Sequence, residues 1–86
     1  MEASREAAVL AALRAVRRLI AELELAVAQR GEDGDAEAVR LAGMIVEARH
    51  HERLLADLAR PAAALDEATM FLMRAGHVVR GGILAA

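Results

Sequence analysis

The sequence has no cysteine, tryptophan, tyrosine or lysine, and it has one phenylalanine among its 86 residues. The lack of cysteine excludes disulfides, thiolate metal sites and cysteine nucleophiles, and the lack of lysine excludes Schiff-base chemistry. No apolar run approaches the ~18 uncharged residues that a membrane span needs, and the start, Met1–Glu6, does not resemble a secretory signal. We therefore expect a soluble, cytoplasmic protein with no membrane partner.

The chain also lacks a region dominated by one sign of charge. Charged residues make up 28% of it, their signs are interspersed, and the net charge is −2. Nucleic-acid binding needs a basic patch or stripe, so we expect no nucleic-acid partner. The hydroxyl groups of Ser4 and Thr69 have no evident base beside them, and we expect no enzymatic activity and no cofactor.

Small apolar residues dominate what is present. Hydrophobic residues make up 57% of the chain, and much of that share is alanine. A domain of this length buries a comparatively small share of its surface when it folds alone. We therefore expect a homo-oligomer, in which copies of the chain bury the apolar surplus between them.

The first helix is predicted over residues 4–30, with Ser4 as its N-cap. Its apolar residues recur at alternating spacings of four and three, which is typical of a helix packed lengthwise against a partner. Gly31 is predicted to end this helix, and Asp35 is predicted to be the N-cap of the next one. The residues between them favour a turn. The apolar stripe consists of Val9, Leu13, Val16, Ile20, Leu23 and Val27.

The second helix is predicted over residues 36–59 and has apolar residues on two sides. A surface helix normally has one apolar stripe, so a second one indicates a second packing partner. The main face holds Leu41, Met44, Ile45, Ala48, Leu55 and Ala59. The thinner, roughly opposite line holds Val39, Val46, His50 and Leu54.

Proline interrupts the pattern at Arg60-Pro61 and leaves three interpretations open. Pro61 lies in the first turn of a third helix in one interpretation, and it kinks a continuous helix in another. In the third interpretation, Asp66 caps a helix that begins later. We favour the first interpretation and predict a third helix over 62–80. Gly81-Gly82 is predicted to end it, and the apolar tail that follows, 83–86, is predicted to dock on the protein. Because the other residues of this helix are also largely apolar, we expect it to be buried on all sides. Its main apolar stripe is Leu65, Thr69, Leu72, Gly76 and Val79.

Together these elements predict an all-α fold in one domain, 1–86, in which a helical hairpin and a third helix after Pro61 pack as a helical bundle in a homo-oligomer. The subunit contacts are assigned to apolar residues of the second and third helices. They are Met70, Phe71, Met73, Val78, Ile83, Leu84, Val39, Val46 and Leu54.

The polar residues suggest several sites. Glu47 and His50 share a helix face at the spacing used in di-metal bundles, although such a site needs further ligands from other helices. His77 shares a face with Met70 and Met73, which are soft-metal and haem ligand types. For Glu47 and His50 we favour an ordinary solvated helix face over a metal site, and for His77 and the methionines we favour core packing over a cofactor site.

Four further polar residues lie on or beside the apolar faces of the first two helices. A carboxylate there is costly unless it is paired, so we predict a buried polar network that fixes helix register. A pocket for acid–base or ligand chemistry is the alternative, since burial can raise the pKa of a glutamate. The four residues are Arg17, Glu24, His51 and Glu52.

The segment Gly34–Ala42, GDAEAVRLA, resembles the loop-cap-helix phrase of computationally designed helical bundles and helical oligomers. Regular heptads and the lack of cysteine fit that class, whereas His50-His51 and Gly81-Gly82 depart from it. The resemblance implies a structural, self-assembling protein without a natural substrate. The alternative is a bundle that binds a metal, haem or small ligand through buried Glu and His residues.

Overall fold

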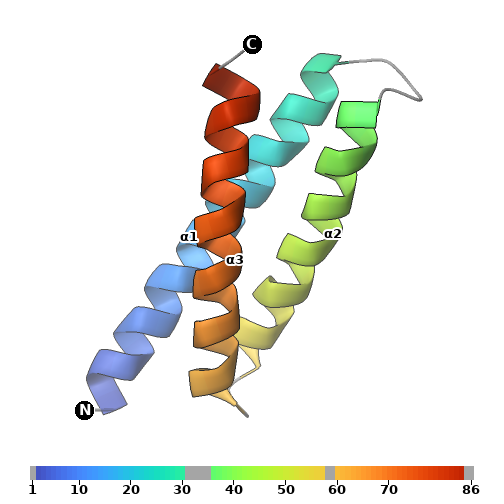
Figure 1. Cartoon of the computed structure of the whole chain (residues 1–86). Helices are drawn as coiled ribbons and strands as arrows, with labels where there is room; N and C mark the ends of the chain where they lie inside the picture. The colour runs from blue at the N-terminus through green and yellow to red at the C-terminus, as the bar shows by residue number, and fades with distance from the viewer. Residues whose placement is uncertain (1, 31–35, 58–59, 85–86) are drawn as a thin grey trace.

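The computed structural model describes residues 2–30, 36–57 and 60–84, and side chains at 4–30, 36–57 and 60–76. Three helices form the fold: α1 (Glu2–Arg30), α2 (Ala36–Ala56) and α3 (Pro61–Leu84). They lie side by side, and each runs antiparallel to the helix before it (Figure 1). The all-α three-helix architecture predicted from the sequence is confirmed.

The contact between α1 and α2 buries the predicted apolar stripes. In α1 the stripe residues from Val9 to Leu23 are buried and Val27 is partly buried. In α2, Leu41, Ala48 and Leu55 are buried, with Met44 and Ile45 partly buried against the same core. The heptad spacing therefore identified the inner faces of both helices, because residues three and four apart lie on one side of a helix.

The inner face of α3 differs from the predicted one. Thr69 is exposed, and its hydroxyl donates a hydrogen bond of 2.7 Å to the carbonyl oxygen of Leu65. Leu65 and Leu72 lie at the edges of the core and are partly buried. Three small side chains and one large one face inward instead. The single chain buries one face of α3, and the prediction that other copies cover the rest remains a prediction. The buried residues are Ala64, Ala68, Phe71 and Ala75.

The helix boundaries decide between the interpretations of the proline segment. Pro61 is the first residue of α3, as favoured, and Ala64 donates an early helical hydrogen bond to the carbonyl of Arg60. The predicted end of the second helix at Ala59 is wrong, because α2 ends at Ala56. The predicted end of the third helix at Arg80 is also wrong: α3 continues through the glycine pair to Leu84, since glycine lowers helix stability by about 1 kcal/mol without forbidding the conformation. The predicted caps Gly31 and Asp35 lie outside the described residues.

The molecule is elongated. Its Cα radius of gyration is 13.9 Å, against about 12 Å for a compact domain of this length, and its extents are 46 × 21 × 16 Å. Among the described residues, none of the helices has a stretch both long and apolar enough to cross a membrane.

Candidate association surface and polar groups

Ion pairs join α1 to α2 at two places among the residues that the structure describes. The Arg17 Nε atom lies 3.0 Å from a carboxylate oxygen of Glu52, and an Arg49 guanidinium nitrogen lies 2.8 Å from a carboxylate oxygen of Glu24. All four side chains keep contact with solvent. The predicted buried network of Arg17, Glu24, His51 and Glu52 is therefore wrong, because its charges lie at the edge of the core in separate pairs.

The order of charges in these pairs bears on helix register. Arg17 on α1 faces Glu52 on α2, and one heptad further along α1 the signs are reversed, with Glu24 facing Arg49. A slip in one direction would bring Arg17 toward Arg49, and a slip in the other would bring Glu24 toward Glu52. Because like charges repel, these slipped alternatives are disfavoured. A role of these residues in fixing register remains a prediction.

His51 is the one member of that set with a buried side chain. It is 7% exposed, and its ring stacks on that of Phe71 from α3 with 4.7 Å between centroids. Its Nδ1 atom has no hydrogen-bond partner among the residues that the structure describes. Burial is the main cause that lowers the pKa of His51 below its ordinary value, and His50 lowers it further.

The metal candidates do not converge. Glu47 and His50 are both exposed, and Glu47 lies 3.6 Å from Arg74 of α3 in an ion pair. Within the described part of the chain, no three His, Asp or Glu side chains are placed to share a metal ion. The side chain of His77 lies outside the described residues.

The predicted association residues divide into three groups. Met70 and Met73 are 66% and 72% exposed, and Val39 and Val46 are exposed to a similar degree. Phe71 is wrongly assigned, because it is 3% exposed inside the chain's own core, and Leu54 is partly buried against that core. The side chains of the remaining three lie outside the described residues: Val78, Ile83 and Leu84.

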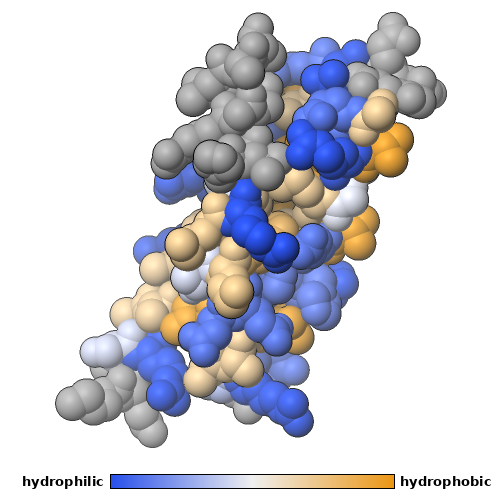
Figure 2. All heavy atoms as spheres, in the orientation of Figure 1, coloured by the Kyte–Doolittle hydropathy of each residue, from blue (hydrophilic) through white to orange (hydrophobic). Residues whose placement is uncertain are grey.

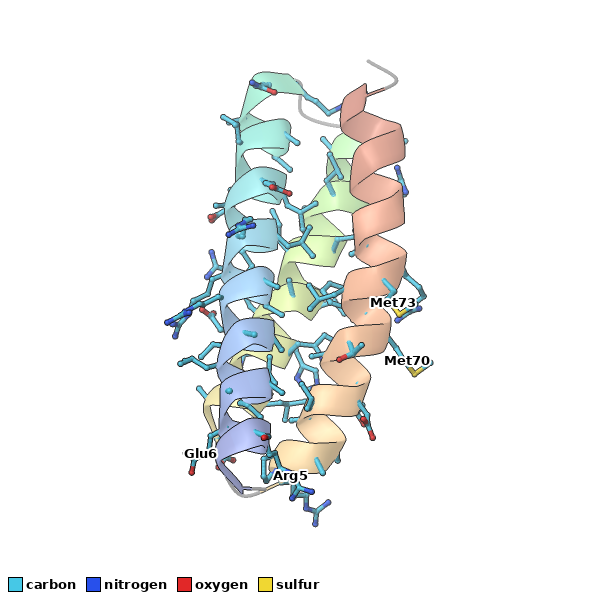
Figure 3. The ribbon with its side chains drawn as sticks, turned by 90° about the vertical axis from the view of Figure 1, so that its left-hand side faces the viewer. Arg5, Glu6, Met70 and Met73 are labelled. Carbon is cyan, nitrogen blue, oxygen red and sulfur yellow. The ribbon has the colours of Figure 1, made fainter. Side chains whose placement is uncertain are left out.

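The exposed members of the predicted association set lie on two sides of the bundle, and Leu10 and Leu25 of α1 are exposed as well. Met70 and Met73 project outward from α3 (Figure 3), and hydrophobic residues also reach the surface along the outer side of α2 (Figure 2). An open groove runs between α1 and α3 beside the methionines. Its walls are mostly apolar and include alanines that the sequence pattern did not single out. The lining residues are Ala8, Ala11, Ala12, Leu65, Asp66, Thr69, Met70, Leu72 and Met73.

A second hollow lies at the end of the bundle where α2 ends and α3 begins. It has a volume of about 640 Å³ and apolar walls, and Arg5 and Glu6 supply its charged groups. Both lie near the N-terminal end of α1 (Figure 3). Sequence reasoning missed this cavity, because it depends on how far the N-terminal turns of α1 extend beside the α2–α3 corner. The apolar lining consists of Val9, Leu10, Leu13, Leu55, Ala56 and Pro61.

These features define a three-helix bundle with exposed apolar side chains among the charged ones on α2 and α3. Comparison with known proteins found no matching protein family, curated protein or solved structure.

Proposed function

We propose that this protein is a self-assembling helical bundle without enzymatic activity, whose copies associate through exposed apolar residues of α3 and α2. The observation that carries the proposal is the pair Met70 and Met73. They are one turn apart on α3, both mostly exposed, and both at the edge of the apolar groove. Flexible, polarisable methionine side chains suit a surface that packs against another protein.

The size of the apolar contribution limits how strong the association can be. Burying one large apolar side chain contributes ~1.5–3 kcal/mol, whereas bringing two chains together costs about 4–15 kcal/mol. Met70 and Met73 alone therefore offset part of the cost, and Val39 and Val46 would have to contribute as well. We expect weak association, with dissociation constants on the order of micromolar or above.

Measurement of mass against concentration tests the proposal. Sedimentation equilibrium or light scattering from about 1 μM to 1 mM should give a mass that rises above that of one 9.2 kDa chain. The double variant Met70→Glu, Met73→Glu should remain helical and lose this rise. The matched control, Ala62→Glu with Ala63→Glu, adds the same charge at exposed positions of the same helix and should keep it.

Either of two results would reject the proposal. One is a single-chain mass over the whole concentration range. The other is association that both double variants weaken equally, because the effect would then come from added charge and not from loss of the methionine surface.

The end cavity favours small-ligand binding as a second candidate function. Its apolar walls and its volume of about 640 Å³ are in the range of ligand sites in proteins. An apolar fluorescent dye such as anilinonaphthalene sulfonate should bind it in a saturable way. Leu10→Glu places a charge in its wall and should abolish binding, whereas Leu25→Glu changes an exposed leucine of α1 outside the cavity and should not.

A further inference from the structure

The buried histidine between α2 and α3 is the feature that the proposed function does not use. His51 lies on the inner face of α2, where its neighbours along the helix face, Ala48 and Leu55, are almost completely buried. Its ring stacks on Phe71, which is the largest of the inward-facing side chains of α3. Any change in the charge of this ring therefore occurs inside the contact between the two helices.

The ring is unsatisfied as well as buried. Its Nδ1 atom is inaccessible to solvent and has no partner among the described residues. A protonated imidazole donates from both ring nitrogens, so the charged form would need an acceptor at Nδ1 that the described contacts do not supply. A buried donor without an acceptor costs about 1–3 kcal/mol, and more when it is charged.

The charges that act on His51 come from both helices and have opposing effects. On α2, His50 disfavours the charged form and Glu47 favours it; on α3, Arg74 disfavours it and Glu67 favours it. No charged group of α1 is among those that shift its pKa within the described residues. Desolvation is the largest effect and is not offset by the two carboxylates, so the pKa of His51 is lowered.

We propose that His51 makes the packing of α3 on α2 sensitive to acid, so that the bundle loosens when the pH falls below the range in which a free histidine is neutral. The proposal concerns one chain and does not require self-association. An acidic compartment or medium would then weaken the α2–α3 contact.

The direction follows from linkage. The unfolded chain binds a proton at His51 near pH 6.5, and the folded chain binds it only at lower pH, so the contribution to stability is complete above pH 6.5. It is lost as the pH falls from 6.5 toward the lowered folded-state pKa. Within that window the unfolding equilibrium constant should rise by up to about tenfold per pH unit.

The test is denaturant unfolding of the full chain at pH 7.5, 6.5 and 5.5, at one protein concentration, for a matched pair of variants. His51→Gln removes the buried titrating group, whereas His50→Gln removes the exposed neighbour. The wild type and the His50→Gln variant should both lose stability between pH 6.5 and 5.5, the variant by less because His50 contributes to lowering the pKa of His51, and the His51→Gln variant should not. A second variant, His51→Leu, has a similar volume and no polar atoms, and it should fold and lack the acid step even if glutamine is not tolerated.

Native-state hydrogen exchange locates the effect. After division by the intrinsic exchange rate at each pH, acid should lower the protection of α3 amides more than that of α1 amides in the wild type, and the difference should vanish without His51. An identical pH profile for the wild type and both His51 variants would overturn the proposal. So would a wild type that gains stability as the pH falls, since the attraction between an imidazolium and the Phe71 ring would then outweigh desolvation.

Discussion

Leu23 and Leu25 offer a direct test of the core, because they are the same residue on the same helix and differ in burial. Leu23 is 0% exposed and Leu25 is 59% exposed. Leu23→Ala should cost about 3–5 kcal/mol, from the lost transfer free energy and the cavity that remains. Leu25→Ala should change the free energy of unfolding by about 0.5 kcal/mol or less. Because both variants exchange leucine for alanine in mid-helix, the change in helix propensity is the same for each and cancels in the comparison.

The expected loss is large relative to the total. A chain of this length is stable by about 4–13 kcal/mol, so Leu23→Ala removes a substantial fraction of the whole. A loss of 3 kcal/mol should lower the melting temperature by about 12–24 °C, which circular dichroism during heating or denaturant titration measures directly. Equal losses in the two variants would refute the burial pattern described above, because Leu25 would then lie against something that the single chain does not supply. Repeating the measurement after dilution would identify a second copy as that partner.

Two further predictions concern the helix surfaces. Gly43→Ala should stabilise the protein by roughly 1 kcal/mol in denaturant unfolding, because alanine favours helix over glycine. Gly43 lies within α2, and a Cβ atom there meets nothing within 4 Å. A destabilised variant would show that the site is more crowded than described. A double-mutant cycle on Arg17 and Glu52 should give a coupling of about 0.2–1 kcal/mol that decreases in 1 M salt. A coupling unchanged by salt would contradict the exposure of this pair.

The sequence predicted the α1–α2 pair well, because both helices have apolar residues large enough to mark one face. It failed for α3, where Leu65 and Leu72 are at the edge of the core while Ala64 and Ala68 face inward. An apolar pattern that extends nearly around a helix contains no information on its orientation. Alanine is also common on both buried and exposed faces of this chain, so it does not identify the face of α3 that packs against the other two helices.

The polar site was predicted only in part. Arg17 and Glu24 were recognised as flanking the apolar stripe of α1, whereas Glu52 was predicted near the centre of the α2 face and is only partly buried. Arg49 and Arg74 were not recognised as partners of Glu24 and Glu47. Long arginine side chains reach carboxylates one or two positions away from the direct helix contact, and that reach depends on helix spacing that the pattern does not specify. His51 was predicted at the border of the inner face of α2 but is buried within it, and its stacking on Phe71 depended on the orientation of α3.

The elongated shape of the bundle affects its elution from a gel-filtration column. A rod-like particle experiences more hydrodynamic drag than a sphere of equal mass, so a lone chain with a long axis of 46 Å should elute ahead of globular standards of its own molecular weight. Early elution would therefore mimic a dimer even when no partner is bound. Frictional ratio and absolute mass should be measured separately. A mass of one chain with a frictional ratio above that of a sphere is the expected result for this elongated bundle.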